Sequence, residues 1–246
     1  MARIITIANQ KGGVGKSTTA ACMTAGLIHL GQTALCVDAD PQGNLSHAFG
    51  ADVSCKGLYE GLTKEVTAAD LIQTTPQGDI IPSTNQNLVG VDNEFRGQIT
   101  LLEELLHPIG QNYQYLVIDT PPSLGILMIN ALFASNDIII PTNADVFSMQ
   151  GLNQLYHSID MLKKHKPYLR VSGVILTRYN AYTTFSRHAR QALENRTDTY
   201  VYKTSIRESI TVREAQAKRQ SLFAYAPRAG VSKDYLNFIK EYLSNA

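Results

Sequence analysis

A glycine-rich segment near the start of the chain combines two lysines with two hydroxyl side chains. It reads Lys11-Gly12-Gly13-Val14-Gly15-Lys16-Ser17-Thr18. Glycines let a backbone curl around an anion with its N–H groups inward, and a following helix N-terminus adds a favourable dipole. Lys16 could then neutralise phosphate oxygens, and the Ser17 hydroxyl could coordinate Mg²⁺. The segment predicts a site for ATP or ADP with Mg²⁺, formed by residues 11–18.

The spelling of this loop departs from the usual phosphate-loop pattern, GxxxxGK[ST]. Gln10 stands where that pattern has its first glycine, and a second lysine, Lys11, opens the loop instead. An additional cation is useful where the charge of a triphosphate is concentrated away from water.

Acidic residues end two further apolar segments. Asp38 and Asp40 belong to the string Val-Asp-Ala-Asp-Pro-Gln-Gly-Asn that closes one apolar run, and Asp119 closes the run Tyr-Leu-Val-Ile-Asp. Open α/β sheets bind ligands at the carboxyl ends of their strands. An apolar strand that ends in aspartate is also the arrangement that holds Mg²⁺, directly or through water, in nucleotide-hydrolysing enzymes. We therefore expect Asp119 to lie beside the phosphate loop.

The elements that must position these residues alternate along the chain. Short apolar runs alternate with longer helical patterns, which predicts an α/β fold with a mainly parallel central sheet flanked by helices on both faces. The expected strands are residues 3–8, 33–38, 115–119, 137–141 and 171–177, with weaker candidates at 79–81 and 200–203. The expected helices are residues 16–30, 100–109, 124–134, 148–164, 183–195, 209–218 and 233–243. Residues 44–93 show only short amphipathic pieces and turns, and Asp145 is expected to cap the helix that follows it.

Composition limits the function classes. The 246 residues suit one domain spanning 1–246, and 44% hydrophobic with 17% charged residues argues against disorder. The three cysteines form no CxxC pair, which favours reduced thiols and a cytoplasmic protein. Neither a signal peptide nor an apolar run long enough to span a membrane is evident, so no membrane partner is expected.

The loop KGGVGKST and the string DADPQGN together resemble the ParA/MinD family of ATPases, relatives of nitrogenase iron protein. The resemblance implies a P-loop fold and an ATP-dependent homodimer in which Lys11 reaches the partner's nucleotide. It also implies that Asp40 orients the attacking water, making Lys11, Lys16 and Asp40 the catalytic residues. Asp38 would join Ser17 and Asp119 near the metal, and Arg178 would lie near the adenine.

Absent features narrow the choice within this family. No cysteine follows Cys55, which argues against a cluster-bridging iron protein, and the mixed-charge C-terminal segment is unlike a membrane-binding helix. The chain most resembles short ParA proteins, which segregate DNA with a ParB-like centromere-binding partner and associate with the nucleoid. Two alternatives stay open: a ParA-like ATPase that positions a non-DNA cargo, and a MinD-like membrane-cycling regulator.

Positive charge is concentrated late in the chain. Residues 170–219 contain ten Lys or Arg against four Asp or Glu, a balance of +6, whereas the remaining residues balance to −5. A local excess of this kind favours contact with phosphate backbones. By resemblance, we expect non-specific DNA binding through basic residues in this half. The candidates are Arg187, Arg190, Lys203, Arg207, Arg213, Lys218 and Arg219.

Overall fold

The structure is a computed structural model that describes residues 1–83, 88, 90–143, 148–196 and 199–245. Asp145, which we expected to cap a helix, lies outside these residues. No helix in the described part of the chain has the length and apolar character needed to cross a membrane.

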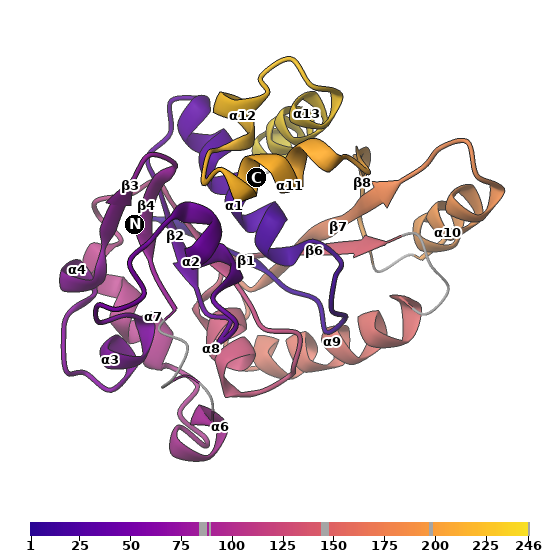
Figure 1. Cartoon of the computed structure of the whole chain (residues 1–246). Helices are drawn as coiled ribbons and strands as arrows, with labels where there is room; N and C mark the ends of the chain where they lie inside the picture. The colour runs from indigo at the N-terminus through magenta and orange to yellow at the C-terminus, as the bar shows by residue number, and fades with distance from the viewer. Residues whose placement is uncertain (84–87, 89, 144–147, 197–198, 246) are drawn as a thin grey trace.

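The strands of the described residues form one eight-stranded sheet with the order β3-β4-β2-β5-β1-β6-β7-β8 (Figure 1). Neighbouring strands are parallel except for β3 and β4, which pair antiparallel at one edge. The strands are β1 Arg3–Ile7, β2 Ala34–Asp38, β3 Gln73–Thr75, β4 Gly78–Ile81, β5 Tyr115–Asp119, β6 Asp137–Asn143, β7 Arg170–Tyr179 and β8 Val201–Arg207.

Helices cover both faces of this sheet (Figure 1). One face carries α1 Lys16–His29, α2 Asn44–Phe49, α11 Ile210–Ala217, α12 Leu222–Tyr225 and α13 Gly230–Asn245. The other carries α7 Leu101–Leu106, the 3₁₀ turn His107–Ile109, α8 Ile126–Ala134 and α9 Ser148–Lys163. Three short helices lie toward the β3 side, and one longer helix lies toward the β8 side. They are α3 Leu58–Leu62, α4 Ala68–Leu71, α6 Val91–Glu94 and, on the β8 side, α10 Thr184–Glu194.

Successive side chains of the central strands enter different cores. Val117 of β5 packs in the core beneath α1, whereas its neighbours Leu116 and Ile118 pack in the core on the opposite face. Because a strand presents alternate residues to opposite faces, a sheet covered on both sides needs apolar residues at every position. This explains the unbroken apolar runs and confirms the predicted α/β class.

A buried carboxylate links the amino-terminal ends of the central strands, at the end of the sheet opposite the phosphate loop. Asp137 at the start of β6 accepts hydrogen bonds from Arg3 Nε of β1, Arg170 Nε of β7 (2.8 Å) and Tyr242 Oη of α13 (2.8 Å). Burial alone would raise the pKa of Asp137, but these donors hold the pKa below its ordinary value. The network joins three neighbouring strands to the last helix.

Most predicted elements are present with shifted ends, and the two weak strand candidates are real as β4 and β8. The elements that were not predicted include β3 and α12, besides the short helices α2, α3, α4 and α6 within residues 44–94. β3 is a three-residue polar edge strand without an apolar signal, and α12 is a single turn begun by the Ser221 side chain. The last helix begins at Gly230, before the predicted residue 233.

Candidate nucleotide-binding site

The glycine-rich loop connects β1 to α1, as the sequence predicts. Gly13 and Gly15 adopt left-handed backbone angles, with φ of 73° and 87°, which side chains other than glycine rarely accept. Gly15 occupies the N-cap position of α1 and supplies no side-chain cap. The first N–H groups of α1 are therefore left for an anion, as helix N-termini require a partner for their free donors.

Polar side chains from two neighbouring segments hold the loop in shape. Asn9 Nδ2 donates to the Pro141 carbonyl oxygen (2.7 Å), and Asn9 Oδ1 accepts from the Lys11 amide (2.9 Å). The Thr177 hydroxyl on β7 donates to the Val14 carbonyl oxygen (2.8 Å). These bonds tie the loop to the carboxyl ends of β6 and β7, so its shape is preset.

Lys16 closes the loop from inside. Its side chain is buried, and its Nζ donates to the Lys11 carbonyl oxygen (3.2 Å). Burial lowers the pKa of Lys16, and the nearby Asp119 and Asp40 carboxylates oppose that effect. A buried ammonium held by carboxylates and a carbonyl is suited to exchange that carbonyl for phosphate oxygens.

Asp119 is the most unusual group of the site. It is fully buried at the end of β5, and neither carboxylate oxygen accepts a hydrogen bond within the described residues. Burial raises its pKa well above the ordinary value, and the adjacent Asp38 carboxylate adds to the rise. The nearby Ser17 hydroxyl partly offsets the rise, although it is not in hydrogen-bond geometry with either oxygen. A buried carboxylate that has no hydrogen-bond donor from the protein normally has a cation or a bound water as its partner. Its surroundings therefore fit a cation such as Mg²⁺.

The side chains around Asp119 could supply only part of the coordination shell of a metal ion. No group of three or more His, Cys, Asp or Glu suited to a metal ion occurs in the described part of the chain. Mg²⁺ in such sites is usually held by one or two protein oxygens, with phosphates and waters completing the shell. Ser17 and Asp119 fit that pattern.

Asp38 lies beside Asp119 but has a different environment. The two residues are register partners on β2 and β5. Asp38 Oδ2 accepts from the Ser46 amide and hydroxyl (both 2.7 Å), and Oδ1 accepts from the Asp40 amide (3.2 Å). Burial raises its pKa to about 6, and these bonds limit the rise. Its bonds assign Asp38 to orienting α2, and its role near a metal stays a prediction.

Asp40 lies at the mouth of the site. Its Oδ1 accepts from the Gln42 amide (2.9 Å), and only a small part of its surface is exposed. Burial raises its pKa, while the Gln42 amide and the Lys16 ammonium oppose the rise. Asp40 borders the same cavity as Gly12, Gly13, Lys16 and Ser17. It is therefore placed to act on a group bound by the loop.

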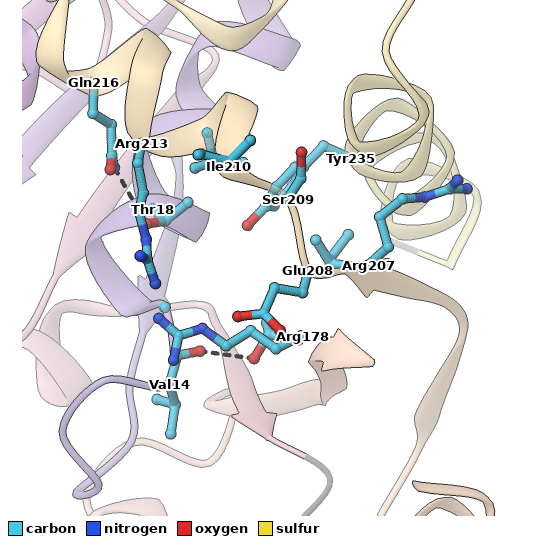
Figure 2. Close-up of a pocket in the computed structure, with 14 residues that line it drawn as sticks. Val14, Thr18, Arg178, Arg207, Glu208, Ser209, Ile210, Arg213, Gln216 and Tyr235 are labelled. Atoms are coloured by element: carbon cyan, nitrogen blue, oxygen red, sulfur yellow. Dashed lines mark hydrogen bonds between the residues drawn. The ribbon is translucent and has the colours of Figure 1, made fainter. Parts of the chain in front are cut away.

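Two cavities meet at the loop. The first has a volume of about 500 Å³ and is lined by the loop, Asp40, Gln42, Asn44 and Pro122. The second, of about 370 Å³, is lined by the segment that follows β8 (Figure 2). Gly15, Thr18, Arg178 and Gln216 border both. Residues of the predicted phosphate loop thus border both cavities.

Cationic side chains converge on the second cavity. Figure 2 shows the guanidinium ends of Arg178 and Arg213 pointing toward one another. Arg178 has a φ of 50°, a left-handed angle that is uncommon for a residue with a side chain. Arg178 borders both cavities, and its contact with adenine stays a prediction. Arg213, a candidate for DNA contact, borders the second cavity.

The other basic candidates occupy three places. Arg187 and Arg190 are on α10, Lys203 is exposed on edge strand β8, and Lys218 and Arg219 follow α11. Arg190 pairs with Glu194 (2.7 Å), and Arg207 makes a two-pronged pair with Asp234 (2.7 and 2.9 Å). Lys218 lies over the Tyr225 ring, 4.8 Å from its centroid. α10 is well apart from α11, so these cations do not form one cluster (Figure 1).

Sequence reasoning missed the residues that support the site from a distance. Asn9, Ser46, Thr177 and Gln216 each bond to a predicted site residue. Asn9 and Ser46 could have been noted as polar residues flanking the motifs. No local signal distinguishes Thr177 or Gln216, because their partners are far away in sequence.

Comparison with known proteins agrees with this geometry. A model of a family described as an AAA domain matches residues 2–171. The sporulation initiation inhibitor protein Soj of Bacillus subtilis is 37% identical over 254 residues and covers 100% of both chains. The chromosome partitioning protein ParA of Caulobacter vibrioides is 34% identical, covering 98% of this chain and 94% of that protein.

Among solved structures, cobyrinic acid a,c-diamide synthase of Mycobacterium smegmatis with bound ADP and magnesium superposes with a TM-score of 0.86 at 28% identity, covering 98% of this chain and 93% of that one. A Cyanothece McdA–ATP complex gives 0.88 at 25% identity, covering 99% and 96%. The matched relatives share the full length of the chain. The chain therefore belongs to the ParA/Soj family of partitioning ATPases.

Proposed function

We propose that this protein is a Mg²⁺-dependent ATPase that segregates DNA, binding ATP or ADP at residues 11–18. The observation that carries the proposal is Asp119, whose two buried oxygens lack hydrogen-bond donors beside the phosphate loop. Mg²⁺ held by Ser17 and Asp119 would neutralise phosphate charge there. The solved relatives bound to ADP with magnesium and to ATP support the same ligands.

Within this proposal the two cavities divide the nucleotide. Lys16 and the amides of the loop bind the phosphates, and Asp40 orients the attacking water. The nucleoside occupies the cavity bordered by Arg178, and the guanidinium groups of Arg178 and Arg213 would face the charged phosphates joined to it. Hydrolysis is slow in the isolated protein, since these residues position water without a strong general base.

ATP-bound chains then form a homodimer in which Lys11 contacts the partner's nucleotide. The dimer binds DNA non-specifically through its exposed cations, and a ParB-like protein stimulates hydrolysis and release. The charge balance of +6 in residues 170–219 supports the DNA contact. The similarity to the chromosome partitioning protein ParA of Caulobacter vibrioides supports the role. Such a protein would be found on the nucleoid.

DNA binding measured with ATP, ADP and no nucleotide at several salt concentrations tests this function. We expect binding to duplex DNA with ATP and little without it. If five to eight cations contact phosphates, log affinity should fall against log salt with a slope of about −4.5 to −7. A DNA affinity that does not depend on nucleotide, or does not depend on salt concentration, would contradict the proposal. ATP-dependent binding to liposomes without binding to DNA would instead favour the membrane-cycling alternative.

A further inference from the structure

Helix α11 is bonded directly to the phosphate-binding helix. Gln216 Nε2 of α11 donates to Thr18 Oγ1, in the first turn of α1, at 3.2 Å (Figure 2). The two residues are separated by 198 positions, and both border the two cavities. This contact therefore lies at the junction between the phosphate cavity and the nucleoside cavity.

The direction of this hydrogen bond determines where the Thr18 proton goes. A threonine hydroxyl has one proton to donate and two lone pairs to accept. Because the Gln216 amide occupies a lone pair of Thr18, the proton stays available for an acceptor in the cavity. Phosphate oxygens are acceptors. Gln216 thus presets the Thr18 hydroxyl as a donor to a nucleotide.

A second contact attaches the end of α11 to α2. The carbon stem of Arg219 lies against Gly50, where an added Cβ would meet Arg219 Cδ at 3.1 Å. Gly50 ends α2, the helix that begins at Asn44, just after Asp40. The exposed cationic end of α11 is therefore linked to both nucleotide motifs, through Thr18 and through α2.

We propose that Gln216 is a positioning residue that sets the Thr18 hydroxyl for a nucleotide phosphate and couples the cationic end of α11 to nucleotide binding. The inference rests on the proposed nucleotide site. Because coupling between two binding sites is reciprocal, DNA on Lys218 and Arg219 strengthens nucleotide binding by the factor with which nucleotide strengthens DNA binding.

The test measures the affinity of ADP with Mg²⁺ by calorimetry for Gln216→Leu, Thr18→Val and the double variant. Leucine keeps the bulk of glutamine without a donor, and valine keeps the shape of threonine without a hydroxyl. Loss of one hydrogen bond should weaken ADP binding about three- to tenfold in Gln216→Leu. In the Thr18→Val background, the same substitution should have no further effect, because Gln216 acts through that hydroxyl. Gln220→Leu, an exposed glutamine just beyond α11, is the matched control and should bind as the wild type does.

A second readout separates positioning from general damage. The ratio of duplex-DNA affinities with and without ATP should fall toward one in Gln216→Leu and stay at its wild-type value in Gln220→Leu. Urea unfolding checks that each variant folds, and Gln216→Met replaces Gln216→Leu if the latter does not fold. Equal ADP affinity of Gln216→Leu and wild type, or an equal loss in the Thr18→Val background, would overturn the inference. Failure of the wild type itself to bind ADP would instead overturn the proposed function.

Discussion

At the residue scale, two adjacent aspartates have opposite hydrogen-bonding environments. Asp38 accepts three donors, whereas both oxygens of Asp119 accept none within the described residues. An unsatisfied buried polar group costs free energy, so Asp119 destabilises the ligand-free fold while Asp38 supports it. This contrast assigns the two carboxylates different tasks despite their adjacent positions.

Paired substitutions test that contrast. In the absence of nucleotide, Asp119→Asn should raise the free energy of unfolding by about 1–3 kcal/mol, because it removes a buried carboxylate without donors. Asp38→Asn should lower it by a similar amount, since an amide would face the Ser46 donors. Urea unfolding with and without Mg²⁺ and ADP provides the measurement. Destabilisation by Asp119→Asn without ligand would mean that the carboxylate has a partner in the folded protein.

Substitution of Asp40 should lower the rate of ATP hydrolysis without lowering nucleotide affinity. Asp40→Ala should lower the single-turnover rate of ATP hydrolysis about a hundredfold or more, because water loses its orienting group. Affinity for ADP should change little, since Lys16 and the loop amides remain. Rapid-quench hydrolysis and calorimetry measure the two quantities. Hydrolysis at the wild-type rate would remove Asp40 from the mechanism.

At the element scale, the end of α11 contains a residue that its backbone disfavours. The amides of Arg219 and Gln220 close the helix by bonding to the carbonyl oxygens of Gln216 and Ala215 (both 3.0 Å). In this type of helix end, the residue in the left-handed conformation is commonly glycine, yet Arg219 occupies it with a φ of 53°. Strained residues of this kind often have a functional reason. The proposed DNA surface offers one.

Substituting Arg219 by glycine and by alanine separates charge from backbone strain. Both variants remove the cation, so both should weaken DNA binding and reduce the salt slope by about 1. Only glycine adopts the left-handed conformation without strain. The free energy of unfolding of Arg219→Gly should therefore be about 1 kcal/mol higher than that of Arg219→Ala. Equal stability would show that Arg219 is not held in the left-handed conformation. DNA affinity equal to that of the wild type in both variants would exclude a role in DNA contact.

The central residues of the site could be predicted because they belong to short, contiguous sequence motifs. The glycine-rich loop, Asp40 and Asp119 could be placed because each motif joins an apolar strand to the residues that follow it. The supporting contacts could not be placed. Thr177 meets Val14 only because β7 and the loop reach the same sheet edge, and Gln216 meets Thr18 only through helix packing. The polar edge strand β3 depends on pairing with β4 and has no pattern of its own.

At the whole-molecule scale, the nucleotide motifs and the late basic segment meet across the carboxyl edge of the sheet. The helices α1 and α11 contact each other there, while α10 carries its cations toward the far β8 side (Figure 1). Positive charge is therefore spread over separate surfaces. This distribution suits sequence-independent binding to an extended polyanion better than binding to one compact ligand.

The proposed function depends on nucleotide binding by the loop after β1, and calorimetric titration of ATP with Mg²⁺ tests this binding most directly. We expect saturable uptake by the wild-type protein and none by Lys16→Ala at the same concentrations, because the substitution removes the ammonium that neutralises phosphate charge. Absence of uptake by the wild type, or equal uptake by Lys16→Ala, would contradict nucleotide binding by this loop.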